Sequence, residues 1–99
     1  MYDMKNLSKL KTLEKLVPNV FKAFLAFDEA AFQEGAIPVK YKELIAVAVA
    51  MTTQCPYCID IHADRARKAG ASDEELAEAT MVAAAIRAGG GVTHATHVV

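Results

Sequence analysis

Apolar residues recur every three or four positions along the first third of the chain, and this spacing predicts two amphipathic helices. The first helix alternates lysines with apolar residues at helical spacing, namely Leu7, Leu10, Leu13, Leu16 and Val17. Ser8 is placed to cap it, and Pro18 either closes it or opens the next helix at its first turn. A second stripe continues to Gly35 and contains Val20, Phe21, Phe24, Leu25, Phe27, Ala31 and Phe32. We expect these phenylalanines to pack in the core and in an interface.

The stretch "VKYKELIAVAVAMTTQ", which begins at Val39, contains no glycine or proline before Cys55. Ile45, Val47 and Val49 alternate with alanine, a pattern that taken alone would suit a half-buried strand. The length and alanine content favour a helix instead, because alanine is the best helix former and a poor strand residue. We therefore predict a mostly buried helix here.

Two further helices are predicted in the second half of the chain. Residues 58–69 form one, which Gly70 ends. The next opens with Ser72 followed three positions later by Glu75, which is the pattern of a capping box. It is expected to continue until the three glycines at 89–91, after which "VTHATHVV" forms a last short helix or an arm that docks on a neighbour.

The predicted fold is therefore all α, with five or six helices in one domain spanning residues 1–99. Hydrophobic residues make up 54% of the chain, more than a lone small helical domain can easily hide, so we predict a homo-oligomer. The net charge of −1 gives no basic field for nucleic acid or an anionic membrane surface. The longest apolar run, residues 44–51, is far shorter than the roughly 20 residues that span a bilayer. No apolar signal-peptide core follows Met1, and we expect a cytoplasmic protein.

Candidate chemistry is concentrated in "TTQCPYCIDIH", which contains Cys55 and Cys58. Two cysteines in a cytoplasmic protein indicate redox chemistry or metal binding more often than a structural crosslink. Cys-Pro-Tyr-Cys also occurs in glutaredoxins, but a thioredoxin-type fold needs a central sheet and no segment after Cys58 reads as a strand. At this spacing the pair can close a disulfide across the first turn of a helix, where backbone N–H groups stabilise a thiolate.

His62 and Glu43 are the residues expected to serve this pair. His62 follows Cys58 by four positions and so lies one turn along the same helix face, where an imidazole can take the thiol proton. Glu43 is the candidate to orient His62, because it precedes a long apolar run where a carboxylate is costly unless it is paired. The spacing shows that this contact can form but does not establish it.

Zinc binding is a second interpretation of the same residues. Cys55, Cys58 and His62 with a fourth ligand such as His94 or Glu43 make a chemically acceptable set. Against it, three of these ligands crowd into eight residues, whereas structural zinc sites usually draw on two separated segments. His94 and His97 could also bind metal as a pair, but solvent exposure or an interface contact is favoured near the end of the sequence. We expect no metal and no cofactor, and a non-catalytic assembly module is a further alternative.

Over about residues 38–91 the sequence resembles the carboxymuconolactone decarboxylase-like superfamily, and more narrowly its alkylhydroperoxidase D-like branch. The resemblance rests on Glu43 before an apolar helix, on Cys-x-x-Cys-x-x-x-His, and on "AGASDEEL" before an acidic helix start. It implies an all-α domain that assembles into trimers or hexamers. It also implies a hydroperoxide substrate and reduction by an external dithiol or thiol protein.

The resemblance further implies a role for each site residue. Cys58 would be the thiolate oxidised to a sulfenic acid, activated through His62 with Glu43 completing the proton relay, and Cys55 would resolve it as a disulfide. The sequence departs from alkylhydroperoxidase D at Tyr57, where histidine is frequent, and this removes one proton-shuttling group. A decarboxylase or lactone-processing enzyme is the alternative within the superfamily, although that branch does not depend on the cysteine pair.

Overall fold

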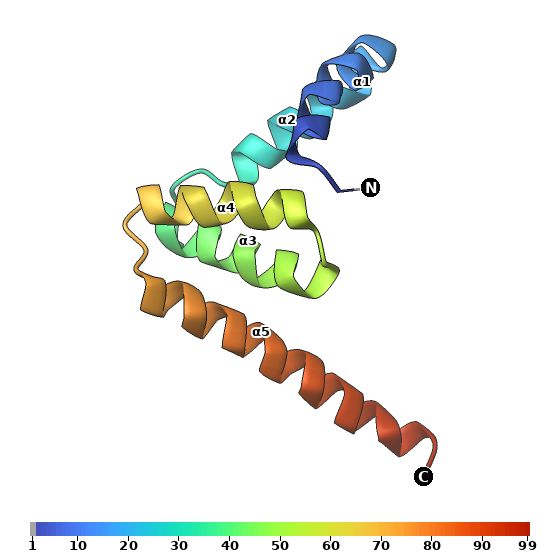
Figure 1. Cartoon of the computed structure of the whole chain (residues 1–99), viewed down its shortest axis with the longest axis vertical. Coiled ribbons are helices and arrows are strands. Elements are labelled where there is room, and N and C mark those ends of the chain that lie inside the picture. Colours follow the sequence, from blue (N-terminus) through green and yellow to red (C-terminus); the bar gives the residue numbers. More distant parts are fainter. Residues whose placement is uncertain (1) are drawn as a thin grey trace. The chain divides into compact units, whose positions relative to one another are not determined.

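The computed structural model describes residues 2–99, and this part of the chain is helical with no strand (Figure 1). The all-α prediction is therefore confirmed. The chain forms two compact units, one ending at Val39 and the other comprising Lys40–Val99. The elements in order are η1 (Met4–Lys9), α1 (Leu10–Leu16), α2 (Pro18–Ala31), α3 (Val39–Thr53), α4 (Pro56–Lys68), α5 (Asp73–His94) and η2 (Ala95–His97). The prediction of one domain over the whole chain stays a prediction.

The first unit agrees with the sequence analysis at Pro18 and departs from it at the cap of its first helix. Pro18 opens α2 at its first turn, where its missing N–H leaves no bond unmade. Ser8 does not cap a helix: its hydroxyl donates to the Lys5 carbonyl over 2.8 Å. Asp3 caps η1 instead, since its carboxylate accepts from the Lys5 N–H over 2.9 Å. The second stripe also ends early, because α2 stops at Ala31 rather than near Gly35.

No residue of η1, α1 or α2 is buried. Phe24 and Phe27 are 56% and 72% exposed, so the prediction that they form a core is wrong for the single chain. A short unit of this size has too little material to enclose its own apolar stripe. The interface part of that prediction remains open to test.

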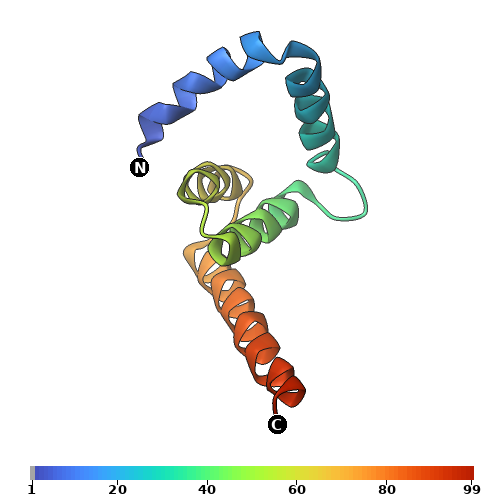
Figure 2. The same ribbon diagram turned by 90° about the vertical axis from the view of Figure 1, so that its right-hand side faces the viewer.

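The second unit holds the buried core. Leu44 and Val47 of α3 pack with Ala66 of α4, with Ala71 in the connection that follows it, and with Leu76 in the first turns of α5. Figures 1 and 2 show α4 lying across α3, while the last turns of α5 run clear of both. The small side chain of Ala66 is fully buried, which allows the helix backbones to approach closely.

The junction between α4 and α5 follows the sequence prediction. Gly70 ends α4 with a left-handed φ of 99°, and the Ala71 N–H donates to the Ala66 carbonyl over 2.9 Å. This is a Schellman motif, which glycine favours because it lacks a Cβ. Ser72 and Glu75 then form the predicted capping box, with N···O distances of 3.1 and 2.9 Å.

The three glycines at 89–91 do not end α5, which continues to His94, so this prediction is wrong. Glycine lowers helix propensity by about 1 kcal/mol relative to alanine but keeps its backbone donor, unlike proline. The helical hydrogen bonds of α5 therefore continue through these three glycines. Apart from the adjacent residues and the backbone of the same helix turns, a Cβ at any of these positions would meet no atom within 4 Å.

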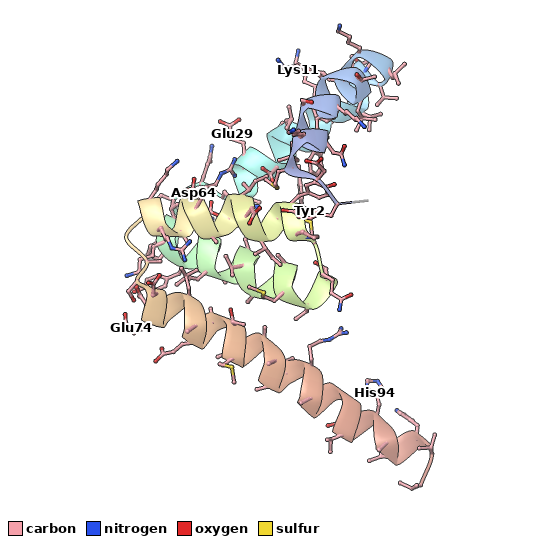
Figure 3. All side chains as sticks on the ribbon, viewed as in Figure 1. Tyr2, Lys11, Glu29, Asp64, Glu74 and His94 are labelled. Carbon is pink, nitrogen blue, oxygen red and sulfur yellow. A yellow bond between two sulfur atoms is a disulfide. The ribbon has the colours of Figure 1, made fainter. Side chains whose placement is uncertain are left out.

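The polar surface of this unit carries ion pairs near the helix ends. Lys40 and Glu75 lie 2.9 Å apart and join the starts of α3 and α5, while Arg67 and Asp73 lie 3.5 Å apart. Figure 3 shows Asp64, Glu74 and His94 projecting from the outer surfaces of α4 and α5. Within residues 2–99, no helix combines the length and apolarity needed to cross a bilayer.

Candidate functional site

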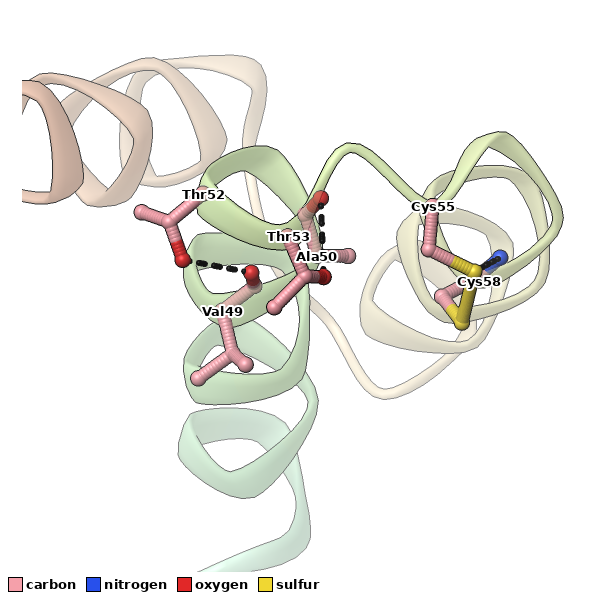
Figure 4. The surroundings of a disulfide bond; sticks show 6 residues. All are labelled: Val49, Ala50, Thr52, Thr53, Cys55 and Cys58. Atoms are coloured by element: carbon pink, nitrogen blue, oxygen red, sulfur yellow. Dashed lines mark hydrogen bonds between the residues drawn. A yellow bond between two sulfur atoms is a disulfide. The ribbon is translucent and has the colours of Figure 1, made fainter.

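The cysteine pair forms a disulfide at the start of α4, as the spacing predicted (Figure 4). The two Cα atoms are 5.3 Å apart. Cys55 is the N-cap of α4, with extended backbone angles, and Pro56 occupies the first helical position. The helix therefore begins at Pro56 rather than at Cys58 as predicted, because the fixed φ of proline suits a first turn.

The Cys55 sulfur lies against the N-terminus of α4. The Cys58 backbone N–H donates a hydrogen bond to Cys55 Sγ over 3.3 Å. The first turn of α4 contains no acidic residue, whereas its last turn contains Arg65, Arg67 and Lys68. The unopposed N–H groups at this end of the helix favour negative charge on a nearby atom.

Glu43 and His62 are brought into direct contact by the packing of α3 on α4. Glu43 Oε2 lies 2.6 Å from His62 Nδ1, although the residues are 19 positions apart in the sequence. Their side chains are 5% and 15% exposed. The structure thus forms the contact that spacing alone could not establish.

This contact defines which ring nitrogen of His62 is used by the carboxylate. When Nδ1 donates its proton to Glu43, the lone pair of the neutral imidazole is on Nε2. The carboxylate then fixes the orientation of the ring and stabilises the imidazolium that forms when Nε2 takes a proton. A base of this kind, one helical turn from Cys58, can exchange protons with a thiol or with a departing oxygen.

A mostly apolar cavity of about 490 Å³ lies between α3, α4 and α5. Its wall includes Ile59, the residue after Cys58, together with Met51 and Met81. Asp60 and Arg67 add charge to the wall. None of the four predicted site residues lines it, so the cavity lies beside the cysteine helix rather than over the disulfide.

The sequence analysis missed Gln54, the residue that connects α3 to the cysteine pair. Its φ is 55°, and it is the one non-glycine residue with positive φ within residues 2–99. Residue type gave no signal here, because glycine and asparagine are the usual markers of this conformation. The one signal in the sequence was its position immediately before Cys55, at the end of the predicted helix.

The zinc interpretation gains no support from the side-chain arrangement. Within residues 2–99, no three His, Cys, Asp or Glu side chains converge as a metal-binding group. His94 Nδ1 lies 2.9 Å from the Gly90 carbonyl, and the rings of His94 and His97 are 5.6 Å apart between centroids. The two candidate fourth ligands thus serve other contacts, His94 within α5 and Glu43 on His62.

Comparison with known proteins places this arrangement in a family. Residues 18–99 match the carboxymuconolactone decarboxylase family. An uncharacterized protein of the cox locus from Paracoccus denitrificans is 51% identical over 73 residues, covering 74% of this chain and 66% of that protein. An uncharacterized protein from Cupriavidus necator is 40% identical over 74 residues, covering 75% and 64%. The chain thus spans slightly less than two thirds of the length of these curated relatives.

Two solved structures share the fold. A protein from Methanobacterium thermoautotrophicum superposes with a TM-score of 0.81 at 38% identity, covering 87% of this chain and 97% of that one. The apo form of a carboxymuconolactone decarboxylase family protein from Legionella pneumophila gives a TM-score of 0.78 at 35% identity, covering 83% and 73%.

Proposed function

Because the chain belongs to the carboxymuconolactone decarboxylase family, we propose that it is a cytoplasmic thiol-dependent peroxidase that cycles the Cys55–Cys58 dithiol and disulfide. The observation that carries the proposal is the buried contact between Glu43 of α3 and His62 of α4, because His62 lies one helical turn beyond Cys58 on the cysteine helix. A carboxylate is retained in an apolar setting only with a strong partner, and here the partner is a proton-transfer group.

The first step oxidises Cys58. His62 takes the thiol proton, and the thiolate sulfur attacks the terminal oxygen of a hydroperoxide ROOH. The O–O bond breaks, Cys58 becomes a sulfenic acid, and the proton returned by His62 converts the departing alkoxide into the alcohol ROH. Glu43 stabilises the imidazolium during the interval in which His62 carries that proton.

The second step closes the disulfide. The Cys55 thiolate attacks the sulfur of the Cys58 sulfenic acid, and hydroxide leaves as water after protonation. An external dithiol, either small or on a partner protein, then reduces the disulfide by two exchange steps and is itself oxidised to a disulfide. The spacing of the pair supports closure of the disulfide, because a disulfide between Cys55 and Cys58 fits the first turn of α4.

We also propose that the protein works as a homo-oligomer, a trimer or hexamer. The support is the amount of apolar side chain that the single chain leaves exposed on each unit. Val20 and Phe27 of α2 are 71% and 72% exposed, and Met81 and Ile86 of α5 are 67% and 72% exposed. Exposed apolar residues at such density mark protein–protein contact surfaces.

The experiment that tests the function is a thiol count on reduced protein before and after one equivalent of an organic hydroperoxide. We expect rapid loss of both thiols as an intramolecular disulfide, stoichiometric alcohol, and no hydroperoxide consumption by the Cys58→Ser variant. The Cys55→Ser variant should react once and stop at a sulfenic acid, which dimedone traps. Wild-type thiols that persist for many minutes would exclude the peroxidase and leave disulfide exchange with a protein partner.

A further inference from the structure

The redox pair begins where α3 ends, and only Gln54 and Cys55 lie between α3 and α4. The Cys55 N–H donates to the Ala50 carbonyl over 3.2 Å, which is the six-to-one bond of a Schellman motif that closes α3. Cys55 is also the N-cap of α4. Its backbone donor therefore finishes one helix while its side chain accepts at the start of the next.

Gln54 makes this junction by adopting the left-handed conformation, with φ of 55°. Residues with a Cβ enter this region at a cost, and glycine is the usual choice. The same motif recurs at the end of α4, where Gly70 has φ of 99° and the Ala71 N–H bonds the Ala66 carbonyl. Both helices thus end with a left-handed residue and a six-to-one bond, and the end that has a residue with a Cβ in the left-handed position is the one before the disulfide.

We propose that Gln54 is a positioning residue for the Cys55–Cys58 couple: its left-handed turn holds Cys55 Sγ on the Cys58 N–H and so stabilises the Cys55 thiolate. The inference rests on the proposed redox function of the pair. Three bonds support it. The Cys55 N–H donates to the Ala50 carbonyl over 3.2 Å. Figure 4 shows the other two: the Thr53 hydroxyl donates to the same carbonyl over 3.5 Å, and Cys55 Sγ accepts from the Cys58 N–H over 3.3 Å.

The chemical consequence concerns the order of bond breaking when the disulfide is reduced. An attacking thiolate from an external dithiol bonds to one sulfur and expels the other, and the more stable thiolate leaves faster. With Cys55 held on a backbone donor, attack at Cys58 forms the mixed disulfide and releases Cys55 as the thiolate. The second thiol of the reductant then attacks the reductant sulfur that is bonded to Cys58. This releases the Cys58 thiolate and leaves the reductant as a disulfide.

The test measures the pH dependence of Cys55 alkylation by iodoacetamide in a Cys58→Ser background, which keeps the backbone N–H at position 58. Gln54→Val disfavours the turn, because a β-branched residue fits the left-handed region poorly. Gln54→Gly keeps the turn and removes the side chain. Gly70→Val is the matched control, since it damages the same motif at the end of α4.

We expect Gln54→Gly to keep the pH profile of the Cys58→Ser parent. Gln54→Val should move the midpoint of that profile upward, so that the alkylation rate at pH 6 falls about tenfold. Gly70→Val should lower the denaturation midpoint and leave the profile unchanged. Tyr57, Asp60, His62 and Glu43, the titratable groups nearest along α4 and α3, are the same in every variant.

A Gln54→Val variant with intact helices and an unchanged profile overturns the proposal, and so does an equal shift in Gly70→Val. Where Gln54→Val does not fold, the test rests on Gln54→Gly, which keeps the turn but lacks the side chain. A shifted pH profile in Gln54→Gly would assign the effect to the glutamine side chain and overturn the proposal. A separate arm treats the oxidised wild-type protein with 2-mercaptoethanol and maps the adduct, which we expect on Cys58. No arm uses a hydroperoxide, so failure of the peroxidase and failure of this inference give different results.

Discussion

Glu43 Oε2 and His62 Nδ1 lie 2.6 Å apart across the packed faces of α3 and α4, one turn beyond the Cys55–Cys58 disulfide. The carboxylate is nearly inaccessible to water, so its hydration is replaced by this one imidazole contact. The relationship joins the stability of the unit to its chemistry. A substitution at either residue should therefore change both the free energy of unfolding and the rate of thiol oxidation.

Glu43→Gln should keep the fold and slow the oxidation of Cys58 by hydroperoxide at least tenfold. The amide still accepts a hydrogen bond from His62, but it carries no charge to stabilise the imidazolium. Stopped-flow measurement of thiol loss checks this. Glu75→Gln is the matched control, since Glu75 is an ion-paired acid at the start of α5 and has no part in the proposed proton relay of Glu43 and His62. Wild-type oxidation rates in Glu43→Gln would remove Glu43 from the relay.

His62→Ala should lower the free energy of unfolding by about 3–5 kcal/mol, because it leaves a buried carboxylate without its partner. The double variant Glu43→Gln with His62→Ala should recover part of that loss. Urea denaturation at one fixed protein concentration measures both. A loss below about 1 kcal/mol in His62→Ala would show that the contact contributes little to folding.

Replacing the glycines at 89–91 by alanine should strengthen the C-terminal half of α5. Each substitution favours the helix by up to about 1 kcal/mol, and the added Cβ atoms meet nothing within 4 Å in the single chain. Far-ultraviolet circular dichroism should show equal or greater helicity and a higher melting temperature. Loss of helicity would contradict this prediction. Loss of assembly with helicity intact would mean that the glycines are needed for close approach by another chain.

The Lys40–Glu75 pair should make stability depend on pH at both extremes. The pKa of Glu75 is lowered from 4.5 by the hydrogen bond from the Ser72 backbone and then by Lys40, so its contribution is present above pH 4.5 and lost as pH falls through the folded value. The pKa of Lys40 is raised from 10.5 by the hydrogen bond with Glu75, so its contribution is present below pH 10.5 and lost at higher pH. Melting temperatures of wild type and Glu75→Gln should converge as the pH falls from 4.5 through the lowered pKa of Glu75 in the folded protein. A constant difference across the pH range would contradict this.

Introducing charge on the exposed apolar faces should reduce assembly. Ile86→Lys on α5 and Phe27→Lys on α2 each place an ammonium group where an apolar contact is proposed, and desolvating it opposes association. Sedimentation velocity should show the wild-type protein as a trimer or hexamer and at least one variant as a smaller species. Lys22→Glu, a polar exchange on α2, is the control. A monomeric wild-type protein would refute the oligomer.

The sequence by itself determined the helical class, the redox pair and much of the local capping. The Ser72–Glu75 capping box, the helix stop at Gly70 and the disulfide across the first turn of α4 all formed as predicted. These features depend on residues within a few positions of one another, and such local backbone interactions can be predicted from the sequence. The helix through residues 89–91 was misjudged because glycine weakens a helix without interrupting its hydrogen bonds.

Only the tertiary structure decided the long-range relationships. The contact of Glu43 with His62 spans 19 positions and depends on how α3 crosses α4, which is set by the packing of Leu44, Val47 and Ala66. The left-handed turn at Gln54 was likewise hidden, because glutamine has no preference for that conformation and is held there by the helices on either side. A sequence records which side chains are available, whereas packing fixes which of them meet and which backbone strain is retained.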